Sequence, residues 1–249
     1  MLRGLTGVSL LLCAAYGVFG QSAPPPAFEV ASVKTNTSGS GSSSSNGSKG
    51  QTVFTNLTLR QFVTRAYNIK DFQLTGPDWM GNIRFDITAK YPGETTNEQR
   101  AVMLQTLLAE RFNLAVHRES KEMPAYALVL AKNGPKLEEG KPGGVSTSSN
   151  RGRFEDKGVS MAGLADQLAR QLERPVADKT GLTGVYNLRL EWTPDDQPAG
   201  KGDGAAGEPA LGPSIFTALQ EQLGLKLQTQ KMPVEIIVVD HVDRTPIEN

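Results

Sequence analysis

The chain contains few of the residues that build common catalytic and metal centres. Its 249 residues include one cysteine, Cys13, and two histidines, His117 and His241. Because Cys13 lies in the apolar N-terminal stretch, the remainder offers no thiol nucleophile, disulfide framework or thiolate metal site. A zinc site needs three or four ligands, so two histidines would need help from carboxylates. We therefore expect no metal and no cofactor.

An excess of charge of either sign is also missing. Lysine and arginine together number 26, aspartate and glutamate also number 26, and the formal net charge is zero. A nucleic-acid-binding protein is expected to show a basic excess, and electrostatic attraction to an anionic membrane surface needs one as well. The balance therefore argues against nucleic acid as a partner.

The N-terminus has the pattern of an export signal. Arg3 supplies a positive start, and the apolar stretch after it is too short to span a bilayer. Val18 and Gly20 are small residues at positions −3 and −1, which predicts cleavage before Gln21. The alternative is an N-terminal anchor helix that is retained. We expect residues 1–20 to be a signal peptide, and the mature protein to be periplasmic or extracellular and not integral to a membrane.

Composition and periodicity divide the rest of the chain into segments. The predicted segments are a Pro-rich spacer (21–27), a first α+β module (28–137) with a flexible Gly/Ser loop (35–50), a linker (138–152) and a second α+β module (153–249). Polar side chains at 56–58 predict the cap of a helix that starts at Leu59. Thr95 and Glu98 resemble a capping box, which predicts a helix over 98–111 with Val102, Met103, Leu107 and Leu108 on its buried face.

The two predicted modules repeat the same order of sequence features. Segments 56–69, 82–92, 107–116 and 121–137 match segments 158–171, 184–194, 218–227 and 230–246. In the last match, Met123-Pro124 aligns with Met232-Pro233. The repeat predicts an α+β fold of two tandem similar modules, each a small, mainly antiparallel sheet packed by two helices. The alternative is a single intertwined domain in which the similarity is accidental.

The stretch 174–192 predicts a strand, a tight turn and a second strand that together form a hairpin. Gly181 and Gly184 would supply the positive φ angles that such a turn needs. Asp178 and Lys179 open this turn and have no counterpart in the first repeat. They are therefore candidate functional positions.

The tetrapeptide Asp178-Lys179-Thr180-Gly181 also matches two enzyme signatures. The phosphorylated aspartate of cation-pumping ATPases needs a following threonine, where this chain has Leu182, and a multi-span membrane body. The Lys-Thr-Gly element of penicillin-binding enzymes and β-lactamases needs a Ser-x-x-Lys nucleophile, and this spacing does not occur in the chain. The turn explains the tetrapeptide better than either enzyme does.

The histidines supply the remaining candidates. His117 and His241 each lie at or near the end of a predicted strand. Asp240 and His241 could act as an orienting carboxylate and a base toward a serine nucleophile, although no G-x-S-x-G elbow is present. The alternative is that both histidines lie at strand edges without a chemical role. His117, Asp240 and His241 are candidate functional positions, and no complete catalytic set is predicted.

Segments spread over the mature chain carry a family resemblance. They include FEVASVK (28–34), GPDWM (76–80), RFDITAK (84–90), RPVADKTGLTGVYNLRLEWTPD (174–195) and the stretches 103–137 and 216–249. These closely resemble the soil-associated secreted family of Solibacter-type acidobacteria, a domain of unknown function. The resemblance implies a bacterial exported protein and transfers no catalytic residues. Some relatives look fused behind a membrane metallopeptidase of the antibiotic-sensor type, which would imply extracytoplasmic sensing or binding.

A second resemblance concerns the order of elements only. The repeat unit looks similar to the short N-terminal modules of secretins and TonB-dependent receptors, which are small partner-binding domains. Together these features predict a non-enzymatic envelope protein that binds an envelope protein or a cell-wall-derived ligand. The rival is a secreted hydrolase with a site around Asp240 and His241.

Overall fold

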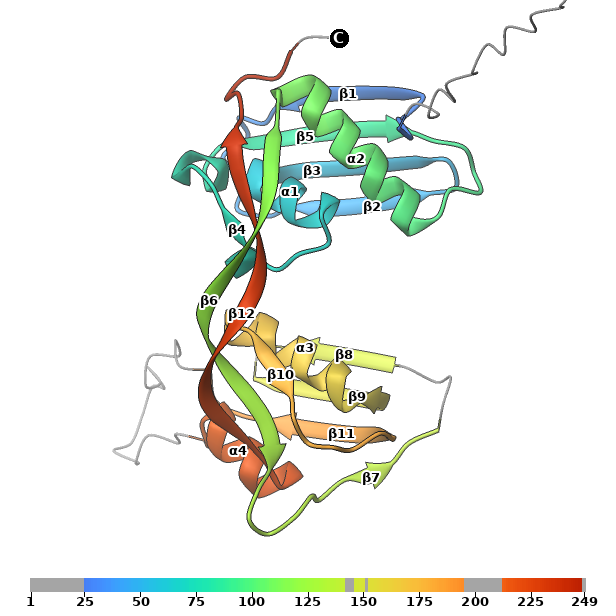
Figure 1. Ribbon diagram of the computed structural model, residues 1–249. Helices are drawn as coiled ribbons and strands as arrows, with labels where there is room; N and C mark the ends of the chain where they lie inside the picture. The colour runs from blue at the N-terminus through green and yellow to red at the C-terminus, as the bar shows by residue number, and fades with distance from the viewer. Residues whose placement is uncertain (1–24, 142–145, 151, 195–211, 248–249) are drawn as a thin grey trace, which may run out of the picture.

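The computed structural model describes residues 25–141, 146–150, 152–194 and 212–247. The predicted α+β class is confirmed: this part of the chain forms four α-helices and three four-stranded, mostly antiparallel sheets (Figure 1). The helices are α1 (Leu59–Ala66), α2 (Asn97–Phe112), α3 (Met161–Gln171) and α4 (Ile215–Leu223). The predicted signal peptide, 1–20, lies outside the described residues.

The N-terminal lobe is an antiparallel sheet with the strand order β1-β5-β3-β2. Its strands are β1 (Val30–Thr35), β5 (Arg84–Lys90), β3 (Gln51–Thr58) and β2 (Ser44–Ser48). Helices α1 and α2 cover one face of this sheet (Figure 1). Between helices and sheet lies a core whose fully buried members include Phe62, Phe85, Ile87, Leu108 and Phe112. Two short 3₁₀ helices, η1 (Asp71–Gln73) and η2 (Asp78–Gly81), follow α1.

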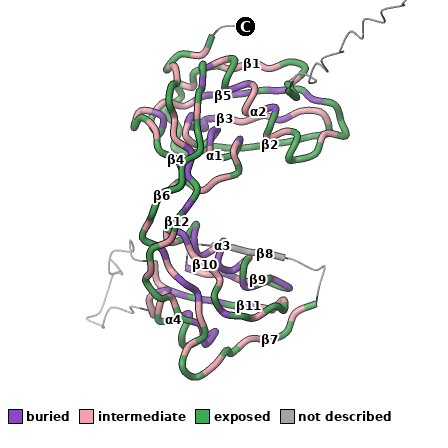
Figure 2. The backbone as a smooth tube through the Cα atoms, in the orientation of Figure 1, coloured by how far each residue is buried: buried purple, intermediate pink, exposed green. Residues whose placement is uncertain are grey.

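The C-terminal lobe repeats this arrangement with the strand order β7-β11-β9-β8. Its strands are β7 (Glu138–Glu139), β11 (Val185–Glu191), β9 (Arg153–Ser160) and β8 (Ser146–Asn150). Helices α3 and α4 pack on it and bury Leu164, Leu168 and Leu219. Figure 2 shows that buried positions gather within each lobe.

A long two-stranded ribbon joins the lobes (Figure 1). It consists of β6 (Ala115–Leu130) and β12 (Leu225–His241), which pair antiparallel along their lengths with Met123 opposite Met232. The short strands β4 (Leu74–Thr75) and β10 (Val176–Asp178) add in parallel to β12 and β6, respectively.

The ribbon exchanges core residues between the lobes. Leu128, on β6, belongs to the C-terminal core, whereas Ile237, on β12, belongs to the N-terminal core. Each core therefore takes a strand end from the other half of the sequence. The division into modules 28–137 and 153–249 remains a prediction from the sequence repeat. Each hydrophobic core contains residues from both of these modules.

The two lobes also share a backbone irregularity at equivalent positions. Asn56 in β3 and Gly158 in β9 have positive φ angles of 61° and 66°. Each donates its backbone N–H to a side-chain oxygen on the neighbouring strand, Asp86 Oδ1 at 2.8 Å and Asn187 Oδ1 at 3.2 Å. Because the segments 56–69 and 158–171 begin at these residues, their similarity has a physical basis in a shared strand bulge.

Two segments predicted to be irregular contain strands. The loop predicted over 35–50 includes β2, and the linker predicted over 138–152 includes β7 and β8. An edge strand is held by backbone hydrogen bonds to its neighbour, so a Ser- and Gly-rich composition does not signal it. Asn56 adds a specific contact, donating its Nδ2 to the carbonyls of Ser40 and Ser42 at 2.7 Å each.

The hairpin predicted at 174–192 is not formed. Strand β10 pairs with β6, whereas β11 pairs with β9 and β7, so the two strands belong to different sheets. The turn between them is real: Asp178 Oδ1 accepts from the Thr180 N–H at 2.9 Å and from its hydroxyl at 2.8 Å. Gly181 has the expected positive φ of 73°, and Gly184 does not adopt one. Local sequence predicts a turn but not the strands' distant partners.

The helix caps were predicted within one residue. The α1 cap at Thr58 is confirmed, with its side chain accepting from the Gln61 N–H. The second capping box joins Thr96 and Gln99, one residue later than predicted. Of the residues predicted on the buried face of α2, Met103, Leu107 and Leu108 are buried, whereas Val102 is 37% exposed.

Candidate functional site

The structure brings together two of the five predicted positions, His117 and Asp240. The sequence pattern had paired Asp240 with His241. His117 on β6 and Asp240 on β12 are cross-strand neighbours, with Nδ1 and Oδ1 2.8 Å apart. His241 instead places its Nε2 3.2 Å from Asp243 Oδ1. The carboxylate of Asp240 therefore orients His117 rather than His241. Both side chains of the His117–Asp240 pair are about half exposed, at 51% and 48%.

The other two predicted positions lie in the C-terminal lobe, at the end of β10. The Asp178 carboxylate is occupied by its turn contacts with Thr180. Lys179 is exposed and donates its backbone N–H to the Leu128 carbonyl at 2.8 Å. In the part of the chain that the structure describes, no three His, Cys, Asp or Glu residues cluster so as to hold a metal. Among the same residues, no helix is long and apolar enough to cross a membrane.

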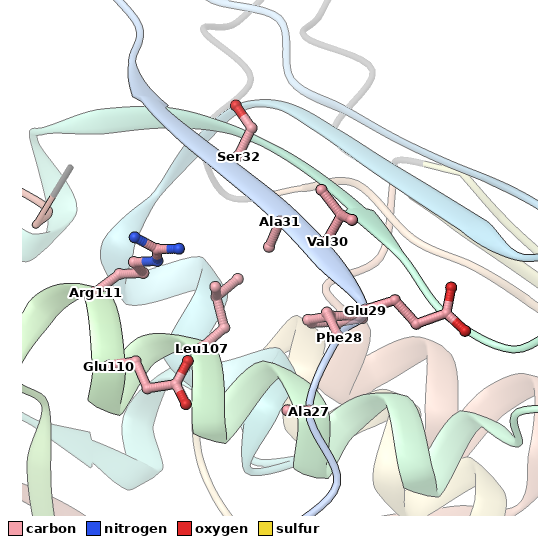
Figure 3. A pocket seen from close by; sticks show the side chains of 9 residues that line it. All are labelled: Ala27, Phe28, Glu29, Val30, Ala31, Ser32, Leu107, Glu110 and Arg111. Atoms are coloured by element: carbon pink, nitrogen blue, oxygen red, sulfur yellow. The ribbon is translucent and has the colours of Figure 1, made fainter. Parts of the chain in front are cut away.

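The feature that sequence reasoning missed is a groove between the edge strand β1 and helix α2. Its cavity volume is about 360 Å³. The lining residues are Ala27, Phe28, Glu29, Val30, Ala31 and Ser32 of the strand side and Leu107, Glu110 and Arg111 of the helix. Figure 3 shows Leu107 projecting from α2 toward β1, while Val30 and Ser32 point away from the helix. The chain entering β1 is held over α2 by the Thr106 hydroxyl, which donates to the Pro26 carbonyl at 2.9 Å.

One edge of β1 carries backbone hydrogen-bonding groups that pair with no other strand of the described residues. The Asn36 N–H donates to the Arg84 carbonyl at 2.8 Å, and register pairs Lys34 with Asp86 and Ser32 with Thr88. Bonded and non-bonded pairs alternate along antiparallel strands, so Ser32, Lys34 and Asn36 face β5. The N–H and C=O groups of the intervening residues, 31, 33 and 35, point outward, away from the sheet, because β1 is its terminal strand.

Two acidic residues and one basic residue line the groove, and they differ in their contacts with the rest of the chain. Glu29 and Glu110 are exposed, and neither forms an ion pair with another described residue. Arg111 is held by the C-terminal segment, since its Nη1 donates to the Ile247 carbonyl at 3.4 Å and its own carbonyl accepts from the Ile247 N–H at 2.7 Å. Contact with a neutral carbonyl does not cancel the positive charge of Arg111, so the groove carries charges of both signs.

A second groove, of about 340 Å³, lies where the ribbon passes between the lobes. Lys70 of the N-terminal lobe reaches Asp166 on α3 in an ion pair, and Arg170 contacts the same carboxylate. Burial lowers the pKa of Lys70 below its ordinary value, and the positive charge of Arg170 adds to this, although Asp166 lies against the ammonium. This ion pair ties the lobes together beside the ribbon.

The C-terminal core contains a carboxylate that is 1% exposed, that of Asp156. Its Oδ2 accepts from Gln167 Nε2 at 2.9 Å, but its Oδ1 and the Gln167 Oε1 have no hydrogen-bond partner. We expect Asp156→Asn to raise the free energy of unfolding by about 1 kcal/mol, because the new amide can donate to Gln167 Oε1 and the buried charge is removed. Urea denaturation monitored by tryptophan fluorescence measures this change.

The control for this prediction is the neighbouring Glu155→Gln, which removes a charge from a more exposed site on the same strand. We expect it to change stability by less than about 0.5 kcal/mol. A loss of stability in Asp156→Asn would show that the carboxylate has a stabilising partner and would contradict the expectation.

Comparison with known proteins gives a family but no precedent for the site. A family model described as "Protein of unknown function (DUF3738)" matches residues 60–242. No curated protein matches the chain, and no solved structure does. The match includes α2, the ribbon and most of both lobes, and it begins after β1.

Proposed function

The chain belongs to the DUF3738 family of proteins of unknown function, and we propose that it is an exported, non-catalytic bacterial envelope protein that binds a polypeptide partner in the groove beside β1. The observation that carries this proposal is the outward row of backbone groups on β1 next to a cavity of about 360 Å³. Unpaired strand edges are sites where another chain can add by backbone hydrogen bonding.

Export and envelope location rest on the sequence. The signal-peptide pattern of residues 1–20 supports export. The resemblance to a soil-associated secreted family supports an acidobacterial origin, and the resemblance to secretin and TonB-receptor modules supports partner binding. Microscopy of the tagged protein in its host, with fractionation of periplasm and medium, tests the location.

A selection with random peptides tests the proposed binding. Dodecapeptides displayed on phage are selected on immobilised mature chain and then counter-screened on Ala31→Pro, which blocks the outward edge of β1. We expect the enriched peptides to bind the wild type and to lose binding on Ala31→Pro. Peptides that bind both proteins equally would place the binding surface elsewhere and would overturn the proposal.

The rival function is a secreted hydrolase, which the His117–Asp240 hydrogen bond favours because it resembles a base and its orienter. Under the binding proposal, a panel of ester, peptide and glycoside substrates gives no turnover above buffer with the mature chain. Turnover that disappears in His117→Ala or in His241→Ala would establish the hydrolase. A cell-wall-derived ligand is tested in the same preparation by thermal shift with muropeptides.

A further inference from the structure

A further cavity of the N-terminal lobe lies at its β2 side, on the face of the sheet that the helices cover. Its volume is about 270 Å³, just below the range of about 300–1,000 Å³ common for ligand pockets, so it suits a small molecule. On its floor, the ring of Phe54 meets that of Phe62 of α1 edge-on, with centroids 5.5 Å apart. The lining residues are Phe28 ahead of β1, Ser45 and Gly47 of β2, Thr52 and Phe54 of β3, Arg65 of α1, and Arg100 and Leu104 of α2.

The charges that line this cavity are of one sign. Arg65 and Arg100 are the charged members of its lining, and neither forms an ion pair with another residue that the structure describes. Strands β2 and β3 contain no charged residue, and α1 contains no acidic one. Two acidic residues stand nearby in the sequence: Glu29 lines the groove beside β1, and Glu98 lines a neighbouring groove that also borders Arg65. The pKa of Glu98 is lowered first by a hydrogen bond from its own backbone N–H and then by Thr96, whereas the charge of Arg100 contributes least. The cavity therefore lacks a carboxylate to balance its two guanidinium groups, which favours an anionic ligand.

Both guanidinium groups are held in place by aromatic rings. The guanidinium of Arg65 lies over the Phe54 ring, 5.7 Å from its centroid. That of Arg100 lies over the Tyr91 ring at 5.2 Å. Arg100 Nη1 also donates to the Tyr91 hydroxyl oxygen at 2.8 Å, and its Nη2 donates to Asn97. Stacking on a ring leaves N–H groups at the edge of a guanidinium available for an anion, so both groups are positioned before a ligand arrives.

The C-terminal lobe closes the equivalent position with a different pair of residues. Counted from the strand bulge of each lobe, Phe54 and Arg65 correspond to Asp156 and Gln167. Gln167 Nε2 donates to Asp156 Oδ2 at 2.9 Å, and Asp156 is 1% exposed. Phe54, by contrast, is half-buried, and Arg65 is exposed. The same helix position accepts glutamine in the other lobe, so the fold does not require an arginine at position 65.

We propose that this cavity binds a small molecule that carries a carboxylate or phosphate group beside an apolar body. Arg65 and Arg100 donate N–H groups to the anionic oxygens, and such charged hydrogen bonds are about twice as strong as neutral ones. The Thr52 hydroxyl, which has no hydrogen-bond partner in the described part of the chain, is a third donor. Phe54 and Leu104 contact the apolar body. The site is separate from the outward edge of β1 and does not depend on the proposed function.

Binding is measured by NMR titration of the isotope-labelled mature chain with benzoate, phenyl phosphate and benzamide. Benzamide has the shape of benzoate without its charge. We expect at least one of the two anions to shift the Nε–H signals of Arg65 and Arg100 and the amide signal of Thr52, with a dissociation constant below about 10 mM. Benzamide is expected to bind at least about tenfold more weakly. The anion that binds more tightly identifies the recognised group as carboxylate or phosphate. The proposal is overturned if neither anion shifts these signals or if benzamide binds as tightly.

Two variants test whether the anion binds in this cavity. Arg65→Gln introduces the residue that the C-terminal lobe has at the equivalent position. Gly47→Val fills the cavity beside Thr52, the cross-strand neighbour of Gly47. The strand accepts valine, because Gly47 does not have a positive φ and an added Cβ meets no described atom closer than the Gln51 carbonyl oxygen at 3.9 Å. Each variant is expected to weaken anion binding at least about tenfold.

Each variant has a matched control. Arg118→Gln removes the same charge from the ribbon, where the Arg118 side chain is 56% exposed. Asn46→Val adds the same side chain on the opposite face of β2. Both controls are expected to leave the affinity for the anion unchanged, and thermal unfolding checks that all four variants fold. If Arg65→Gln and Gly47→Val lose no more affinity than their controls, the anion binds elsewhere and the proposal is overturned.

Discussion

Replacing Leu128 by alanine is expected to lower the free energy of unfolding by about 3 kcal/mol. The side chain is fully buried and lies in the C-terminal core, although it belongs to the first half of the sequence. Removing it leaves a cavity among residues that pack from both halves, and a cavity in a close-packed core relaxes only in part. Urea denaturation, followed by Trp192 fluorescence in a Trp79→Phe background, measures the loss.

The matched control is Leu130→Ala on the same strand. Leu130 is 40% exposed, so its truncation is expected to cost less than about 1 kcal/mol. Equal losses in the two variants would mean that the end of β6 does not contribute to the C-terminal core, and the exchange of strand ends between lobes would be wrong.

Replacing Ala31 by proline is expected to weaken binding of a selected peptide by about tenfold or more. Proline removes the outward N–H of residue 31 and places its ring in the path of an added strand. The fold is expected to tolerate it, because Ala31 does not donate to β5 and Val30 before it is already extended. Isothermal calorimetry with the peptide and thermal unfolding of the variant measure the two effects.

The control places a proline on the opposite edge of the same sheet. A two-residue loop at 49–50 closes the β2–β3 hairpin on the bonded pair Ser48 and Gln51, so the N–H of Ser45 points outward. We expect Ser45→Pro to leave peptide affinity unchanged. If both prolines weaken binding equally, a general distortion of the sheet would explain the result in place of a blocked edge.

Local sequence signals predicted the parts of the fold that depend on neighbouring residues. The Thr58 cap, the α2 helix and strand β5 follow from side-chain chemistry within one turn or from period-2 alternation, and all three form. The matching segments 56–69 and 158–171 each begin at a residue with positive φ and continue through an N-cap, Thr58 or Ser160, into a helix.

The parts that sequence did not predict depend on distant partners. Strands β2 and β8 are stabilised by backbone bonds that their polar side chains do not signal. The pairing of β6 with β12 brings His117 to Asp240 across 123 positions of sequence. The candidate groove was missed for the same reason, because β1 and α2 meet only in the folded chain and β1 is an edge only once the strand order is known.

Amide hydrogen exchange of β1, measured by NMR with and without a selected peptide, tests the central claim most directly. The proposed strand addition requires slower exchange at Ala31, Val33 and Thr35 when the peptide is bound. Ser32 and Lys34, which already face β5, should change little. Protection that appears only outside β1, for example at the groove between the lobes, would contradict the account.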